Sequence, residues 1–138
     1  IAFMHADESA RYKVTIGSDS EQRRAGTADF VTAIVIHRVG NGGRYFFRRV
    51  VIDKTFHTLR DRILEEVLLS LATANELLTE TRTLTMPAFD FEIHVDVGEN
   101  GATRTMMQEL VGMIRAMNFE AKTKPESYAA SKVADRHV

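Results

Sequence analysis

Residues 13–20 read Lys-Val-Thr-Ile-Gly-Ser-Asp-Ser, and this stretch contains the pattern that decides the fold. Val14 and Ile16 share one face with Tyr12, which precedes the stretch, at the period of two that a half-buried strand requires. The apolar run then ends, and Asp19 follows on the other face between two serines. The pattern predicts a strand that presents a carboxylate at the rim of a sheet. A second interpretation is that Asp19 and the serines only organise a turn, because such side chains readily bond their own backbone.

Two further runs of β-branched and aromatic residues follow, at residues 30–38 and 44–52. Residues 40–43 between them read Gly-Asn-Gly-Gly, and glycine and asparagine supply the positive φ that a tight hairpin needs. The polar residues 21–29 are expected to form a loop. Together these segments predict a meander of three antiparallel strands.

From about Thr58 the period of the apolar residues changes to the spacings of three, four and seven that are typical of an amphipathic helix. This helix is expected to run to about Leu78, and Thr58 with Asp61 forms a capping pair at its start. Its predicted apolar stripe consists of Leu59, Ile63, Val67, Leu71 and Leu78, with Leu64 and Leu68 beside them.

Alternation returns in residues 91–97, which predicts a fourth strand with Asp96 on its polar face. A second helix with a methionine-rich stripe follows, capped by Asn100 or Thr103, and Asn118 is expected to end it in a left-handed conformation. Residues 119–123 are a short strand candidate, and residues 126–137 form the predicted last helix.

The resulting order is β-β-β-α-β-α-β-α. With 138 residues and 44% hydrophobic side chains, the chain is expected to form one α/β domain over residues 1–138, with residues 1–11 as a lead-in. Helical crossovers make the later strands parallel to their neighbours, so the sequence predicts a five-stranded mixed sheet flanked by helices.

Composition excludes several classes of function. The formal net charge of −1 excludes a polycationic protein that coats nucleic acid. The absence of cysteine excludes disulfides and thiolate metal sites, and fits a reducing compartment. No apolar run reaches the ~18 residues that a membrane helix needs, so a cytoplasmic protein without membrane association is expected.

Carboxylates are the candidates for chemistry. Asp19 and Asp96 each end a predicted strand, and ligands commonly bind beyond the carboxyl ends of strands joined by helical crossovers. A hard divalent cation such as Mg²⁺ prefers oxygen ligands and would relieve the repulsion between two adjacent carboxylates. The first helix adds Glu65 and Glu66, which periodicity does not separate, and Asp135 lies near the end of the chain.

Each candidate also has an ordinary structural interpretation. Asp96 could cap the following helix, while Glu65, Glu66 and Asp135 could be solvated helix residues. His94 and Asp96 share a strand face at a spacing that zinc sites can use, although no third nitrogen or sulfur ligand lies close in sequence.

Five segments carry motifs that are specific in combination: Ile-Gly-Ser-Asp-Ser at 16–20, Ile-Val-Ile-His-Arg-Val-Gly at 34–40, Arg-Arg-Val-Val at 48–51, His-Val-Asp-Val-Gly at 94–98, and Lys-Pro-Glu-Ser-Tyr-Ala-Ala-Ser-Lys-Val-Ala-Asp at 124–135. Together they resemble the YkuK-like bacterial family, which is described as related to ribonuclease H and is otherwise largely of unknown function. The resemblance implies a ribonuclease H-like fold with three leading antiparallel strands, in agreement with the order predicted above.

The resemblance also implies an acidic site made of Asp19, Glu66, Asp96 and Asp135, serving both as metal ligands and as catalytic residues. Similarity of residues 59–63 to the family helix favours Glu66 over Glu65. The implied activity is phosphodiester hydrolysis with two Mg²⁺ or Mn²⁺ ions, acting on RNA, DNA or an RNA–DNA hybrid. Because this superfamily also contains non-catalytic modules, a binding or assembly role is the alternative, with protein partners unknown.

Overall fold

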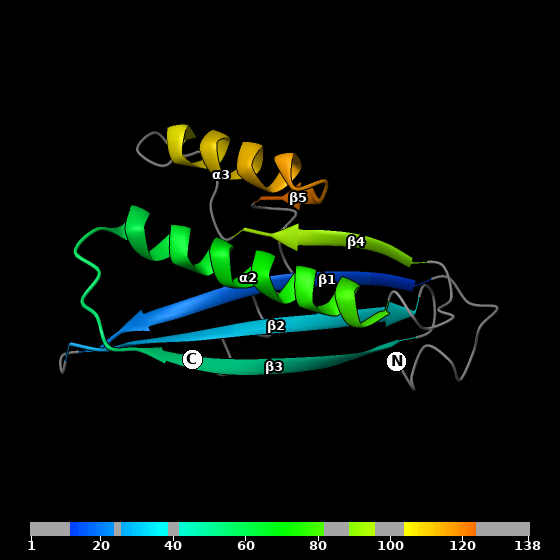
Figure 1. Cartoon of the computed structure of the whole chain (residues 1–138), viewed down its shortest axis with the longest axis horizontal. Helices are drawn as coiled ribbons and strands as arrows, with labels where there is room; N and C mark the ends of the chain where they lie inside the picture. Colours follow the sequence, from blue (N-terminus) through cyan, green and yellow to red (C-terminus); the bar gives the residue numbers. More distant parts are fainter. Residues whose placement is uncertain (1–11, 24–25, 39–41, 82–88, 96–103, 124–138) are drawn as a thin grey trace.

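The computed structural model describes residues 12–23, 26–38, 42–81, 89–95 and 104–123. The predicted last helix and the lead-in at residues 1–11 lie outside these ranges. The described part of the chain forms one sheet with two helices (Figure 1).

The sheet has five strands in the order β3-β2-β1-β4-β5. The strands are β1 (Tyr12–Gln22), β2 (Ala28–Arg38), β3 (Gly43–Ile52), β4 (Phe89–His94) and β5 (Glu120–Lys122). β1 pairs with β2 and β2 with β3 in antiparallel fashion, whereas β1 pairs with β4 and β4 with β5 in parallel. The predicted mixed sheet with a leading meander is therefore confirmed.

β1 continues beyond the point at which the sequence pattern predicts its end. Asp19 lies opposite Val31 in the ladder with β2, and the pairing extends to Gln22. The interpretation of Asp19 and its serines as a turn is therefore wrong, and the loop predicted over residues 21–29 is too long, because Glu21, Gln22, Ala28 and Asp29 belong to β1 and β2. The physical reason is that β2 is as long as β1, so the backbone groups of these small polar residues are satisfied by the ladder.

Two helices cover one face of the sheet: α2 (Leu59–Thr81) and α3 (Arg104–Ala116). The predicted cap of α2 is confirmed, because the Asp61 amide donates to the Thr58 hydroxyl at 3.1 Å. The predicted stop of α3 is also confirmed, since Asn118 adopts a φ of 66° and the Phe119 amide donates back to the Ile114 carbonyl.

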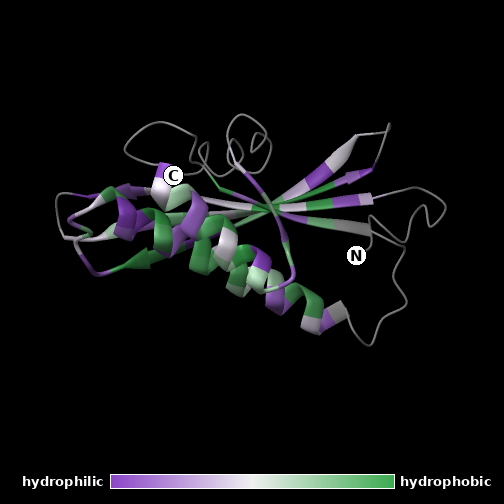
Figure 2. Ribbon diagram, turned by 90° about the horizontal axis from the view of Figure 1, so that it is seen from above, coloured by the Kyte–Doolittle hydropathy of each residue, from purple (hydrophilic) through white to green (hydrophobic). Residues whose placement is uncertain are grey.

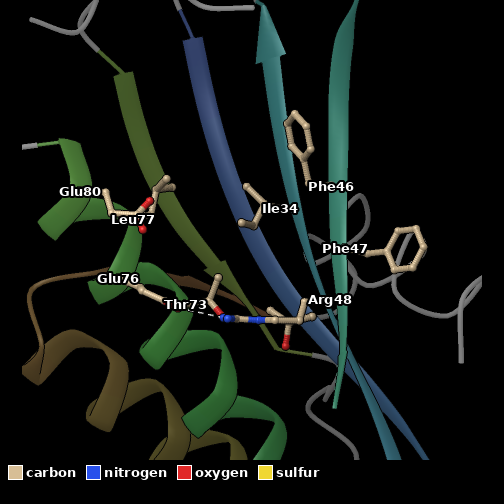
Figure 3. A pocket seen from close by; sticks show the side chains of 9 residues that line it. Ile34, Phe46, Phe47, Arg48, Thr73, Glu76, Leu77 and Glu80 are labelled. Carbon is tan, nitrogen blue, oxygen red and sulfur yellow. Dashed lines mark hydrogen bonds and ion pairs between the residues drawn. The ribbon is translucent and has the colours of Figure 1, made fainter. Parts of the chain in front are cut away.

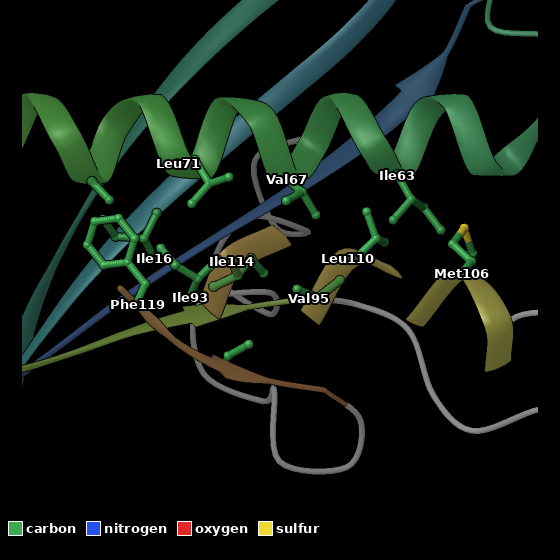
Figure 4. Packing of buried hydrophobic residues seen from close by; sticks show 12 residues of the cluster. Ile16, Ile63, Val67, Leu71, Ile93, Val95, Met106, Leu110, Ile114 and Phe119 are labelled. Atoms are coloured by element: carbon green, nitrogen blue, oxygen red, sulfur yellow. The ribbon is translucent and has the colours of Figure 1, made fainter. Parts of the chain in front are cut away.

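The main core lies between these helices and the central strands (Figure 4). Ile16 of β1 and Ile93 of β4 are register partners and are fully buried beneath α2 and α3. Hydrophobic and hydrophilic residues are interleaved along the elements, as expected where each presents one face to a core (Figure 2). The predicted stripe of α2 is wrong at Leu59 and Leu68, which are exposed.

Within the described residues, neither α2 nor α3 is both long enough and apolar enough to span a membrane.

Candidate functional site

The candidate site lies at the carboxyl end of β1, where this strand extends beyond its parallel neighbour β4. The parallel pairing of β1 with β4 ends at Gly17 and His94, whereas β1 continues for five residues more. Among the described strands, none pairs with β1 on that side beyond Gly17. A small cleft, without room for a water molecule, lies here and is lined by Ser18, Glu66, Val67, Ser70, His94 and Val95.

Glu66 reaches this cleft from α2. Its side chain is buried, with 7% of the residue exposed, and the Ser20 hydroxyl donates to Glu66 Oε2 at 2.5 Å. Glu65 is only half-buried. The structure thus separates two glutamates that helical periodicity leaves equivalent, and it is Glu66 that faces β1.

Hydroxyl groups continue the polar contact between α2 and the sheet. The Ser18 hydroxyl lies 2.7 Å from Ser70 Oγ and 2.8 Å from Thr32 Oγ1. We refer to Ser18, Ser20, Thr32, Glu66 and Ser70, all of them buried, as the polar seam. Sequence analysis missed the seam. The available signal was that Glu66 and Ser70 are four residues apart, next to the apolar positions of the helix.

Asp19 lies between Ser18 and Ser20 in β1 and is half-buried. One of its carboxylate oxygens accepts a hydrogen bond from the Ser20 backbone amide at 2.9 Å. Strand alternation places Asp19 on the face opposite the serines and α2. Asp19 and Glu66 therefore approach the end of β1 from the two sides of the sheet.

The other two predicted acids, Asp96 and Asp135, lie outside the described residues. Val95, which lines the cleft, directly precedes Asp96 in the sequence. Within the ranges that the structure describes, no three His, Asp or Glu side chains are grouped so that they could hold a metal ion. The described part of the site thus contributes two carboxylates, whose oxygens suit a hard divalent cation.

A second polar cluster lies on the sheet face opposite α2. His94 Nε2 is 3.1 Å from Glu92 Oε1, and Lys13 Nζ is 3.2 Å from Glu92 Oε2. Burial raises the pKa of Glu92, but the hydrogen bonds from His94 and Lys13 outweigh it, so the pKa is lowered overall. Burial lowers the pKa of His94, against the opposing effect of Glu92. A neutral His94 donates from Nε2 to Glu92, and Nδ1 is buried with no hydrogen-bond partner in the described structure.

The chain is similar to several known proteins. The 35% identity to the "Uncharacterized protein YkuK" of Bacillus subtilis (strain 168) extends over 145 residues and covers 98% of this chain and 84% of that protein. The N-terminal RNase H domain of Rv2228c from Mycobacterium tuberculosis, solved as a fusion with maltose-binding protein, has a TM-score of 0.37 and is 14% identical, covering 91% of this chain and 94% of that one.

The native protease-reverse transcriptase of prototype foamy virus has a TM-score of 0.43 and is 5% identical, covering 94% of this chain and 21% of that one. A family model described as "Ribonuclease H-like" matches residues 1–138. The chain therefore belongs to the YkuK-like, ribonuclease H-like family.

Proposed function

We propose that this protein is a metal-dependent nuclease of the ribonuclease H type, which hydrolyses phosphodiester bonds in RNA, DNA or an RNA–DNA hybrid. One observation carries the proposal. In a ribonuclease H-like chain, the carboxylates of Asp19 and Glu66 lie at the same end of β1, past its last pair with β4. This is the rim at which ligands bind in sheets with helical crossovers.

Asp19, Glu66, Asp96 and Asp135 would hold the metal in this proposal. Carboxylate oxygens match the preference of Mg²⁺ and Mn²⁺ for hard ligands. When bound, two such ions would activate a water molecule and stabilise the charge on the leaving oxygen. Asp19 would be one of these ligands, because it is carried to the rim by β1, the central strand of the sheet.

The polar seam would position Glu66. The Ser20 hydroxyl donates to one carboxylate oxygen, which fixes the rotamer of the side chain. Hydrogen bonds of this kind orient metal ligands in proteins. The role of Ser20 is therefore positional.

The test is cleavage of labelled RNA, DNA and hybrid substrates in the presence of Mg²⁺ or Mn²⁺, by the wild type and by Asp19→Asn. We expect metal-dependent cleavage that this variant abolishes. Glu21→Gln is the matched control, because Glu21 is an exposed residue on the same strand and the same face as Asp19. The proposal fails if the wild type cleaves none of the substrates with either metal, or if Asp19→Asn cleaves as fast as the wild type.

A non-catalytic binding or assembly module is the second candidate. The observation in its favour is that the buried Glu66 carboxylate already has a structural role, in joining α2 to β1. Calorimetry with Mn²⁺ separates the two proposals. Binding that is lost in Asp19→Asn supports the nuclease, whereas a wild type that binds no Mn²⁺ supports the module.

A further inference from the structure

β3 is an edge strand of the sheet, and it is unusually exposed for a strand so rich in aromatic residues. Tyr45, Phe46 and Phe47 are 46%, 52% and 49% exposed. The ten residues of β3 include Arg44, Arg48 and Arg49 and contain no acidic residue, although the whole chain has a formal net charge of −1. Exposed rings and positive charge are thus concentrated on one strand.

Carboxylates of α2 lie beside β3 on one face of the sheet. On the face toward α2, Arg48 donates to Glu76 at 2.9 Å and to Thr73 at 3.1 Å (Figure 3). A pocket of about 230 Å³ on this side is lined by both Glu76 and Glu80. These carboxylates make the α2 side of β3 unfavourable for an anion.

The opposite face carries Tyr45, Phe47 and Arg49, which we call the aromatic face. Figure 3 shows the Phe47 ring directed away from α2. Residues two apart on a strand are about 7 Å from each other, so the two rings and the guanidinium follow one another in a row. Their partners on β2 are Val35, Ala33 and Val31, all apolar.

We propose that the aromatic face binds a single-stranded nucleic acid, with bases stacked on Tyr45 and Phe47 and a backbone phosphate at Arg49. Stacking on exposed rings beside basic residues is the mode by which proteins hold single strands. In a duplex the faces of the bases are stacked on one another, so they are not available to stack on Tyr45 and Phe47. The inference rests on the proposed function in one respect only: the bound single-stranded nucleic acid is taken to be the substrate that the nuclease cleaves.

Charge argues against a second copy of the chain on this edge. If two β3 strands paired in antiparallel fashion about Phe46, Arg44 of one copy would lie opposite Arg48 of the other. Like charges directly opposite destabilise a pair of strands. A polyanion has the complementary charge, and the aromatic residues give it apolar surface to cover.

Binding is best measured without metal, so that cleavage cannot interfere. Two labelled oligonucleotides of about 16 nucleotides are used, one of thymidine and one of uridine. Each is titrated with protein in EDTA at low salt, and binding is followed by the fluorescence anisotropy of the label. We expect Tyr45→Ala and Phe47→Ala each to raise the Kd roughly tenfold. Arg49→Gln should weaken binding and lower the salt slope by about one.

Leu68→Ala is the matched control, because Leu68 is 45% exposed but lies on α2. It should bind as tightly as the wild type, and Phe47→Trp should keep or improve binding, which excludes misfolding as the cause of any loss. If the wild type binds but does not cleave with metal, the nuclease proposal fails while this one stands.

Two outcomes would overturn the inference. One is a binding result: the wild type binds neither the thymidine nor the uridine oligonucleotide at low salt, or Tyr45→Ala and Phe47→Ala bind as tightly as the wild type. This holds even if the wild type cleaves nucleic acid. The other is a concentration-dependent dimer in analytical ultracentrifugation that Phe47→Ala abolishes, because a second copy would then cover the aromatic face.

Discussion

The hydroxyl of Ser20 donates a 2.5 Å hydrogen bond to the carboxylate of Glu66 and so joins the carboxyl end of β1 to the first half of α2. Both residues are buried, so the bond is protected from competing water. It fixes the rotation of α2 about its own axis at the point where the proposed site lies. One contact thus serves the packing of the helix and the placement of a candidate metal ligand.

Removal of the Ser20 hydroxyl should therefore destabilise the fold. We expect Ser20→Ala to lower the free energy of unfolding by about 1–3 kcal/mol, because a buried carboxylate loses a hydrogen-bond donor. Urea denaturation followed by circular dichroism measures the change. Thr105→Ala is the control, since Thr105 is exposed in the first turn of α3 and its loss should cost no more than about 0.5 kcal/mol. Equal stability of Ser20→Ala and the wild type would show that the bond contributes nothing.

Ser18 should couple energetically to Ser70. A hydroxyl has one proton, so Ser18 donates to one of its two partners, Ser70 and Thr32, and accepts from the other. Ser18→Ala and Ser70→Ala should each cost about 1 kcal/mol, and the double variant should cost less than the sum by about 0.5 kcal/mol or more. A double-mutant cycle in urea tests this. Strict additivity would mean that the two hydroxyls do not interact in solution.

Ile16 and Ile93 lie side by side beneath both helices, and truncation of either should be costly. We expect Ile93→Ala to lower the free energy of unfolding by about 2–5 kcal/mol, through lost apolar contacts and a cavity. Leu68→Ala, a truncation of similar size at an exposed position of α2, should cost far less. Similar losses at the two positions, measured in urea, would contradict the core described here.

Much of this fold follows from local sequence patterns. Runs of β-branched and aromatic residues identify β2 and β3, alternation identifies β4, helical spacing identifies α2 and α3, and Thr58 and Asn118 mark helix boundaries by their own chemistry. The second half of β1 could not be predicted in this way. Its serines and Asp19 are turn formers by local preference, and only pairing with an equally long β2 keeps them extended.

The site is harder to predict, because it depends on how α2 is rotated against the sheet. Glu65 and Glu66 flank the apolar stripe at similar angles, and packing alone decides that Glu66 turns inward while Leu68 turns out. Polar residues on a helix are usually solvated, so the spacing of Glu66 and Ser70 does not by itself identify their partners on β1. The family resemblance identifies the acids that could act together, which periodicity alone does not.

Acid should destabilise the protein through Glu92 and His94, which lie with Lys13 on the sheet face opposite α2. The pKa of His94 is lowered by burial, so below the ordinary pKa of histidine the unfolded chain takes up a proton that the folded one does not, and stability falls. The pKa of Glu92 is lowered as well, so its contribution is present above the ordinary carboxyl pKa and is lost as the pH falls through the folded value.

Thermal denaturation at pH values from 8 to about 4 should show both steps, with the melting temperature falling first as the pH drops through the range near 6.5. His94→Phe should weaken the first step, and Glu92→Gln the second. Lys13 belongs to the same cluster, so Lys13→Met should also reduce the contribution of Glu92. A melting temperature that does not change between pH 8 and 5 in the wild type would contradict the assigned pKa shifts.

Neighbouring glutamates on α2 provide the sharpest test of the proposed site. If Glu66 is a metal ligand, Glu66→Gln should reduce metal-dependent cleavage by about a hundredfold or more, because even partners of metal ligands typically account for 10–100-fold. Glu65→Gln, the same chemical change one residue earlier, should leave cleavage within a few fold of the wild type. Ser20→Ala should fall between them and recover in part at higher Mn²⁺ concentration, as expected where a ligand is misplaced but still present. Loss of cleavage in Glu65→Gln with activity retained in Glu66→Gln would mean that the site is built on the other face of the helix.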